Sequence, residues 1–230
     1  MAKCSVPDNL ICLHIKDQNT EWEEILHLAT RIEVSRGSMI PTQAQKGFYY
    51  IQRGCVRLER LFASGDGQTA LFFEDGSFCA EIPSILFGKS IPDDSGTFFY
   101  AQENSVLYRF SEELLAGDDF AKQYPHLIMS LLRSVAYKSA LLLRNGASNL
   151  TLTPEERISR YLIHLVKKAN GQLCFNPKMS QTDLGTALGI PRSTFCRAIA
   201  HLRTKGALGA FTASRVEILD FAMLQMIASV

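Results

Sequence analysis

The chain has 230 residues, of which 47% are hydrophobic and 20% charged, and its formal net charge is +1. This length exceeds the commonest size of a single domain, so we expect two domains. No run of eighteen apolar residues is present, and the N-terminus lacks a basic segment followed by an apolar one. The sequence therefore predicts neither a membrane span nor a signal peptide. We expect a cytoplasmic protein without a membrane partner.

The charged residues are unevenly distributed along the chain. Residues 150–230 contain ten Lys/Arg and five Asp/Glu, whereas the residues before them contain fourteen Lys/Arg and eighteen Asp/Glu. A basic C-terminal segment on an acidic body is typical of a nucleic-acid-binding domain joined to a domain that does not bind nucleic acid.

The N-terminal half is predicted to be rich in β-strands. A short helical pattern at residues 22–29 is followed, from Ile32 onward, by short apolar runs separated by Gly, Asp and Ser. Strands with turn residues between them predict a β jelly roll within an α+β fold. No histidine lies between Ile32 and Phe110, which argues against a cupin-type metalloenzyme, and we expect no enzyme. The predicted strands lie at residues 48–51, 55–59, 69–73 and 97–101.

Residues 125–144 have the pattern of one long helix whose apolar side chains spread over more than one face. Such a helix must bury more than one face. One face can lie on the β roll and the other on a second copy of the helix, which predicts a homodimer. Residues 145–149 are small or polar and predict a hinge between two domains.

A helix-turn-helix pattern extends from Ser180 to Gly206. Upstream of it, residues 153–156 open a helix with a capping box and a proline at the first helical position. Ser180 can cap the first helix of the motif, because its hydroxyl accepts from unpaired backbone donors of the first turn. Gly189 suits the corner, where a left-handed residue is needed, and Pro191 fits only the first turn of the second helix.

The second helix of this motif has an apolar back and a polar front. A surface helical hairpin with solvated arginines would show the same pattern. However, residues 207–211 and 215–219 flank a short turn and predict a wing after the helix, which favours DNA binding. Long cationic and short hydroxyl side chains suit guanine edges and phosphates. The back consists of Phe195, Ile199 and Leu202, and the front of Arg192, Ser193, Thr194, Arg197 and His201.

The six cysteines are scattered over the chain and none shows C-x-x-C spacing. This distribution argues against a zinc finger or a dense disulfide framework, and we expect mainly buried, reduced thiols. Cys196 is the exception, because it lies beside Arg197 on the predicted recognition helix, where a cation favours the reactive thiolate.

The order of these parts resembles the cAMP receptor protein and FNR (CRP/FNR) family of bacterial transcription regulators. Residues 48–58 resemble the family's aromatic strand and the glycine that follows it, and residues 74–82 resemble the turn that leads into its ligand-binding segment. Residues 181–202 match its helix-turn-helix most closely. The resemblance covers nearly the whole chain.

The resemblance implies a cyclic-nucleotide-binding-like β roll at residues 1–120, a dimerisation helix and hinge at 121–149, and a winged helix-turn-helix at 150–230. It implies a homodimer on a palindromic double-stranded DNA operator, a small-molecule effector, and RNA polymerase as a further partner. An effector that favours one arrangement of the roll and the long helix would reorient the DNA-binding domains.

The contacts to DNA are carried over from the family residue by residue. Arg192 and Arg197 match its arginine positions, whereas Ser193 stands where the family usually has a glutamate that binds cytosine. Ser193 cannot select cytosine as a carboxylate does, so we expect an operator that departs from the TGTGA-type half-site. The residues expected at phosphates are Thr194, Gln181, Lys178, Arg203 and Lys205.

The predicted sensor departs from the members that bind cAMP. Glu81 matches the glutamate that holds the ribose, but the arginine-serine pair for the cyclic phosphate falls at Ser95 and Gly96. No arginine lies between Ser77 and Tyr108. Since a buried phosphate without a guanidinium is an unpaired charge, we expect an effector other than cAMP.

An apolar pocket suits haem, which could sense a gas, or a small hydrophobic molecule. Haem would need an axial ligand, for which His14, His27, His126 and the cysteines are candidates. An iron–sulfur sensor needs more clustered cysteines than the N-terminus offers. Two alternatives stay open: a thiol-redox regulator that pairs Cys12 with Cys196, and a cyclic-nucleotide-binding regulator. The residues expected to frame the pocket are Glu81, Phe98, Tyr100, Leu142 and Leu143.

Overall fold

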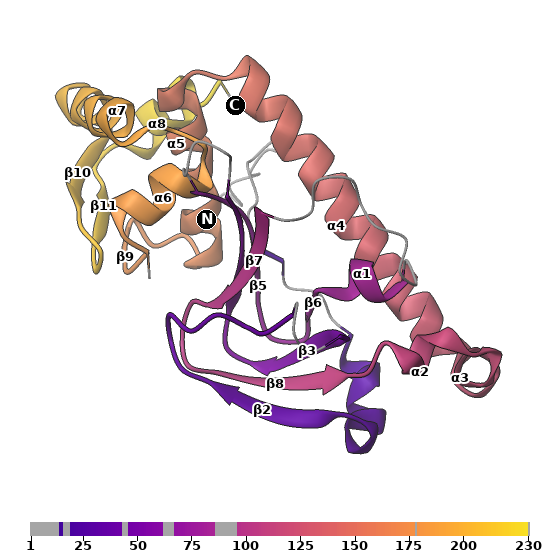
Figure 1. Ribbon diagram of the computed structural model, residues 1–230. Helices are drawn as coiled ribbons and strands as arrows, with labels where there is room; N and C mark the ends of the chain where they lie inside the picture. Colours follow the sequence, from indigo (N-terminus) through magenta and orange to yellow (C-terminus); the bar gives the residue numbers. More distant parts are fainter. Residues whose placement is uncertain are drawn as a thin grey trace. The chain divides into compact units, whose positions relative to one another are not determined.

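The computed structural model describes residues 14–15, 19–42, 46–61, 67–85, 96–177 and 179–229. It divides into two compact units, one within Leu13–Leu142 and the other within Leu143–Val230. Figure 1 shows the strands of the first unit, the long helix α4, and the helices and short strands of the second unit.

The first unit contains the predicted β roll, built from two four-stranded sheets. One sheet has the order β1-β5-β4-β7 and the other β2-β8-β3-β6. The four predicted strands are confirmed as β3, β4, β5 and β7. The strands are β1 His14–Ile15, β2 Thr30–Val34, β3 Phe48–Arg53, β4 Val56–Leu61, β5 Gly67–Phe73, β6 Phe78–Cys79, β7 Thr97–Ala101 and β8 Ser105–Phe110.

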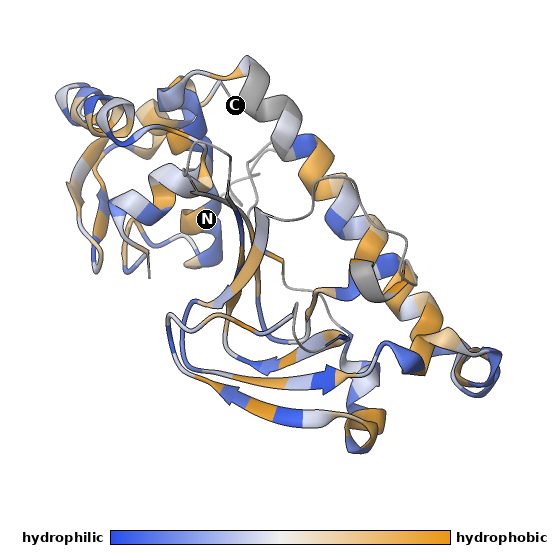
Figure 2. Cartoon of the chain, in the orientation of Figure 1, coloured by the Kyte–Doolittle hydropathy of each residue, from blue (hydrophilic) through white to orange (hydrophobic). Residues whose placement is uncertain are grey.

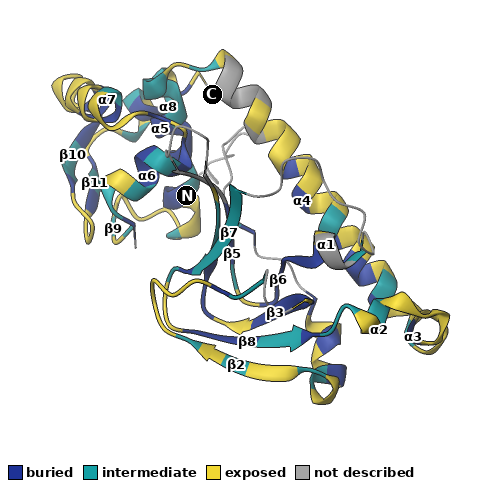
Figure 3. Cartoon of the chain, in the orientation of Figure 1, coloured by how far each residue is buried: buried dark blue, intermediate teal, exposed yellow. Residues whose placement is uncertain are grey.

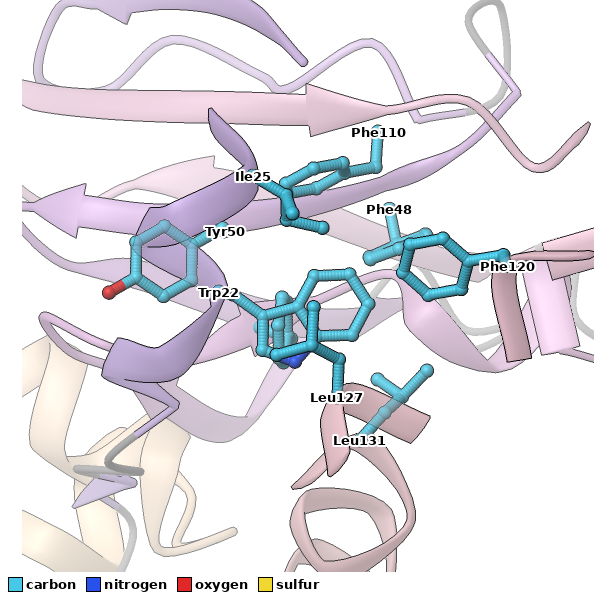
Figure 4. Close-up of a cluster of buried hydrophobic side chains, with 9 residues drawn as sticks. Trp22, Ile25, Phe48, Tyr50, Phe110, Phe120, Leu127 and Leu131 are labelled. Atoms are coloured by element: carbon cyan, nitrogen blue, oxygen red, sulfur yellow. The ribbon is translucent and has the colours of Figure 1, made fainter. Parts of the chain in front are cut away.

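An aromatic cluster fixes the helices of this unit to the second sheet (Figure 4). Trp22 lies at its centre, in the 3-10 helix η1 (Thr20–Leu28), and its ring is 4.9 Å from that of Phe78 and 5.3 Å from that of Phe110. Leu127 and Leu131 of α4 complete the cluster. The remaining helices of the unit are α1 (Glu81–Ile85), α2 (Glu113–Ala116) and α3 (Asp118–Gln123).

Helix α4 extends over 27 residues, Pro125–Thr151. The predicted hinge at residues 145–149 is helical, which corrects that expectation, and the chain leaves the helix at Leu152. Gly146 was a misleading turn signal, because one glycine in a helix costs only about 1 kcal/mol. Residues 125–144 are long and apolar enough to cross a membrane by length and composition alone. However, Leu127 and Leu131 pack in the core of the first unit, and Figure 2 shows apolar and polar bands along the helix.

After the last residues of α4, the second unit continues with α5 (Pro154–Lys168), whose capping box between Thr153 and Glu156 is confirmed. The predicted helix-turn-helix is confirmed as α6 (Gln181–Ala187) and α7 (Arg192–Thr204). The predicted wing is β10 (Leu208–Phe211) with β11 (Val216–Ile218), and β9 (Cys174–Phe175) adds an unforeseen third strand to it. Helix α8 (Phe221–Ile227) ends the unit and contacts α5.

Candidate nucleic-acid interface and sensor site

The corner of the helix-turn-helix depends on two glycines. Gly189 has φ +62°, a left-handed conformation that favours glycine. At Gly185 an added Cβ would lie 3.2 Å from the carbonyl oxygen of Ile190 and 3.5 Å from the ring of Phe195. Gly185 therefore lets α6 approach α7 closely, a role that the sequence pattern alone did not indicate.

Several side-chain contacts hold the corner in place. The Ser180 hydroxyl accepts from the backbone nitrogen of Asp183 at 3.1 Å, and the Asp183 carboxylate accepts from the backbone nitrogen of Ser180 at 3.2 Å. Arg157 of α5 donates to the carbonyl of Leu188 at 2.8 Å. Burial lowers the pKa of Arg157. Arg157 is thus a structural cation of the motif, and it was not foreseen.

Helix α7 has the predicted apolar back and polar front. Phe195, Ile199 and Leu202 are buried, at 2% exposure or less, whereas Arg192 and Arg197 are exposed. Figure 3 shows that much of α7 is exposed. Among the described residues, the guanidinium of Arg197 donates only to the Thr194 hydroxyl, at a long distance of 3.4 Å. The two arginines can therefore reach a ligand without first breaking a strong internal interaction.

The other predicted front residues lie at different depths. Ser193 is exposed and Thr194 is half-buried. His201 is exposed and its Nδ1 lies 3.4 Å from a carboxylate oxygen of Glu155. This contact turns the imidazole toward α5.

Two of the residues expected at phosphates, Gln181 and Arg203, are held by the wing. Gln181 donates its amide to the carbonyl of Phe211 at 2.6 Å, so this group joins α6 to the wing. Arg203 donates Nε to the carbonyl of Gly209 at 3.0 Å and keeps an exposed side chain. Lys205 is exposed at the end of α7, and Lys178 lies outside the described residues.

The wing tip carries a cation that was not assigned from the sequence. The turn is closed by the Thr212 hydroxyl, which accepts from the backbone nitrogen of Arg215 at 3.0 Å. The exposed Arg215 side chain pairs with Glu217 at 3.2 Å. Arg215 therefore adds a cation to the same unit as α7.

The predicted sensor residue Glu81 has an internal partner. Lys138 of α4 contacts Glu81 Oε1 at 2.5 Å and the carbonyl of Phe78 at 2.8 Å. Both side chains are buried, with 6% of Lys138 and 4% of Glu81 exposed. The cation beside Glu81 thus comes from the long helix, 57 residues away in the sequence.

The structure does not bring the five predicted pocket residues together. Phe98 pairs with Glu59 and Tyr100 with Arg57, and the Arg57 guanidinium lies 5.1 Å from the Tyr100 ring. Because alternate residues of a strand point to opposite faces, Phe98 and Tyr100 share the face of Arg57 and Glu59.

Phe99 occupies the face that carries Lys138. Its ring is 6.2 Å from that of Phe73, and the Lys138 ammonium is 5.2 Å from the same Phe73 ring. The sequence prediction therefore chose aromatic residues one position away from Phe99, the residue of β7 that lies near Phe73. Leu142 and Leu143 are 40% and 77% exposed.

The described histidines that were candidate haem ligands make separate contacts. His14 Nδ1 contacts Glu74 at 2.8 Å, and His126 Nε2 contacts Glu24 at 2.8 Å. The part of the chain that the structure describes holds no group of three or more His, Cys, Asp or Glu suited to a metal. His27 is an exposed residue of η1.

Two of the described cysteines, Cys55 and Cys79, are buried, and two, Cys174 and Cys196, are exposed. Burial is the main cause that raises the pKa of the Cys79 thiol, and the Glu81 charge adds to it. Cys79 is therefore an unreactive thiol. The Cys12 partner proposed for Cys196 lies outside the described residues.

Comparisons with known proteins agree with this architecture. Residues 156–227 match the family model of the Crp-like helix-turn-helix domain. No curated protein sequence matches the chain significantly.

Solved structures share the fold over nearly the whole chain. CprK complexed with OCPA has 17% identity and a TM-score of 0.72, covering 94% of this chain and 97% of its own. A CooA mutant from Carboxydothermus hydrogenoformans has 12% identity and a TM-score of 0.73, covering 95% and 99%. A CRP/FNR regulator from Thermus thermophilus has 21% identity and a TM-score of 0.66, covering 87% and 99%. Residues 156–227 therefore carry a Crp-like helix-turn-helix domain, and the chain as a whole shares the fold of solved CRP/FNR regulators.

Proposed function

We propose that this protein is a sequence-specific regulator that binds a palindromic operator as a homodimer, under the control of an effector other than cAMP. The observation that carries the proposal is α7, whose buried apolar back leaves Arg192 and Arg197 exposed on the front. A helix of this kind, followed by a wing, is the arrangement that places side chains in the major groove.

The exposed face of α4 supports a dimer. Met129, Leu132 and Leu143 are 46%, 58% and 77% exposed, and two exposed alanines, Ala136 and Ala140, lie between them. The steps between these five positions are three, four, four and three residues, so the five side chains lie along one side of the helix. The opposite face is buried in the first unit at Leu127, Leu131, Ser134, Lys138 and Leu141. We infer that the exposed seam packs on the same seam of a second copy.

A dimer explains the expected symmetry of the operator. Two recognition helices enter successive major grooves when they lie about 34 Å apart. Arg197 would contact guanine through two parallel hydrogen bonds, and Ser193 would leave the neighbouring base less restricted. Arg203, Lys205 and Lys178 would contact phosphates, which fix the position of the protein without reading sequence. RNA polymerase is a further partner of this proposal.

The sensor favours an effector other than cAMP for two reasons. No arginine lies between Ser77 and Tyr108 to pair a cyclic phosphate. Moreover, Glu81 already has Lys138 as its counter-ion, so its carboxylate is not available to a ribose unless that pair opens. The described aromatic surroundings of the pair, including Phe73 and Phe78, suit a small hydrophobic molecule.

The similar structures do not choose the effector. CprK is complexed with OCPA, and the regulator CLP of Xanthomonas campestris responds to c-di-GMP, so one fold serves different ligands. Haem remains a candidate, but His14 and His126 already contact carboxylates. An absorption spectrum of the purified protein tests it, since bound haem gives a Soret band.

A redox regulator remains the alternative, carried by the exposed Cys196. It predicts that oxidation changes DNA affinity and that Cys196→Ser removes this response.

Selection of binding sites from random double-stranded DNA tests the proposed function. We expect a palindrome whose half-sites keep a guanine for Arg197 and tolerate several bases at the position next to Ser193. Recovery of an unmodified TGTGA-type half-site would contradict the role given to Ser193. Failure to enrich any sequence would contradict sequence-specific binding altogether.

A further inference from the structure

Lys138 contacts both ends of a strained turn, Phe78–Glu81. Ala80 has φ +61°, a left-handed backbone conformation that residues other than glycine rarely adopt. The Lys138 ammonium contacts the carbonyl of Phe78, two residues before Ala80, and the carboxylate of Glu81, the residue after it. Strained conformations of this kind persist only when the surrounding structure imposes them. Lys138 is the described group that clamps both ends of this turn.

The clamp lies in apolar surroundings. The Lys138 ammonium is 5.2 Å and 6.0 Å from the rings of Phe73 and Phe78, and Ala80 is 6% exposed. If one partner of such a buried ion pair loses its charge or moves away, the other partner is left buried without a counter-ion, which is strongly unfavourable. We call the arrangement in which Lys138 contacts both Glu81 and the carbonyl of Phe78 the closed state, and an arrangement without these contacts the open state.

The closed state leaves one buried group of α4 without a partner. Ser134 lies one helical turn before Lys138, is 1% exposed, and its hydroxyl has no hydrogen-bond partner among the described residues. An unpaired buried hydroxyl is unfavourable. The closed arrangement of α4 thus contains both backbone strain at Ala80 and a buried Ser134 hydroxyl without a described partner.

We propose that the Lys138–Glu81 pair is a latch that controls the position of α4. In the closed state it holds Ala80 in the left-handed conformation and fixes α4 to the end of β6. When an effector competes for Glu81 or Lys138, the turn at Phe78–Glu81 relaxes and α4 moves. Because α4 continues without interruption beyond Leu142 into the second unit, its movement is passed to the DNA-binding unit. This inference rests on the proposed control of DNA binding by the sensor.

Three variants of the full-length protein test the latch. Lys138→Met combined with Glu81→Gln removes both charges and opens the latch without leaving a buried unpaired ion. Ala80→Gly keeps the pair and removes the strain, so it stabilises the closed state. Lys122→Met is the matched control, because Lys122 is an exposed lysine of α3 with a pair of only 4.0 Å to Asp119.

Hydrogen exchange of residues 78–85 and of α4 is measured first, without added effector. We expect the double variant to exchange at least about tenfold faster in these segments and Ala80→Gly to exchange more slowly. Fluorescence of Trp22, the single tryptophan of the chain, reports the same change, because its ring lies 4.9 Å from that of Phe78. The control should match the wild type.

Operator affinity, measured by fluorescence anisotropy on the selected DNA, is the second readout. The double variant and Ala80→Gly should shift affinity in opposite directions. A folded double variant with unchanged exchange and unchanged affinity would overturn the latch. If wild-type protein binds no DNA, the proposed function fails, whereas the exchange data still decide whether the latch exists.

Discussion

Arg197 offers the sharpest test of how α7 recognises DNA. Its side chain is exposed, and its only described hydrogen bond is the 3.4 Å contact to the Thr194 hydroxyl. Replacing Arg197 with alanine therefore breaks little within the protein. Its effect on DNA binding should reflect the lost contact to DNA almost alone.

The expected loss follows from the contact that Arg197 would make. Two parallel hydrogen bonds from a guanidinium to guanine give about 1–3 kcal/mol of discrimination against a wrong base. This corresponds to about 5- to 150-fold in affinity at each half-site. Arg197→Lys should lose most of the same discrimination, because an ammonium lacks the planar pair of donors.

Fluorescence anisotropy with the selected operator, with an operator changed at the guanine, and with random duplex measures this effect. We expect Arg197→Ala to weaken binding to the selected operator and to bind the two operators about equally, with a smaller change on random duplex. Arg203→Ala is the comparison, since Arg203 is assigned to a phosphate: it should weaken all three duplexes alike and lower the slope of affinity against salt by about 0.9 per protomer, which is about 1.8 for the dimer. An equal loss on all three duplexes for Arg197→Ala would refute its role as a base contact.

Three further changes test the fold and the dimer. Gly54→Ala should lower the free energy of unfolding of the β roll by about 2–5 kcal/mol, because φ is +114° and an added Cβ would lie 2.8 Å from the backbone of β8. Gly37→Ala is the comparison, since Gly37 has φ +82° but no atom within 4 Å of an added Cβ. It should lose clearly less stability in the same urea unfolding, and equal losses would contradict the clash at Gly54. Thr153→Ala should cost about 1 kcal/mol by thermal unfolding. The backbone and hydroxyl donors of Thr153 lower the pKa of Glu156. The stability that this contact gives the wild type is therefore lost as the pH falls through that pKa. Thr153→Ala should lose less stability on acidification, and an acid dependence equal to that of the wild type would count against the capping box. Leu132→Glu should convert the dimer to monomer in sedimentation velocity, and a dimer of unchanged stability would exclude the α4 seam.

Much of the fold could be predicted because its signals are local. The capping boxes at Thr153 and Ser180 and the corner at Gly189 each involve residues within a few positions of one another, and the structure contains all three. The same holds for the back of α7, where Phe195 and Leu202 recur at helical spacing. Local rules failed at residues 145–149, where the continuous helix outweighs the turn preference of individual residues.

The sensor could not be predicted in the same way. Lys138 and Glu81 are 57 positions apart, and no local pattern pairs a lysine on a helix with a carboxylate after a strand. The pocket prediction also depended on which face of β7 points toward α4, and a shift of one residue exchanges Phe98 and Tyr100 for Phe99. Only the packing of β7 and α4 on Phe73 decides that register.

The stoichiometry of the complex with DNA tests the central claim most directly. Labelled palindromic duplex, at a concentration well above the dissociation constant, is titrated with the purified protein and followed by anisotropy. The proposed regulator should saturate at two protomers per duplex, and half-sites moved apart by half a helical turn, about 5 base pairs, should abolish the tight binding. Saturation at one protomer per duplex, or binding that is indifferent to the spacing, would contradict a dimer that places two α7 helices in successive major grooves.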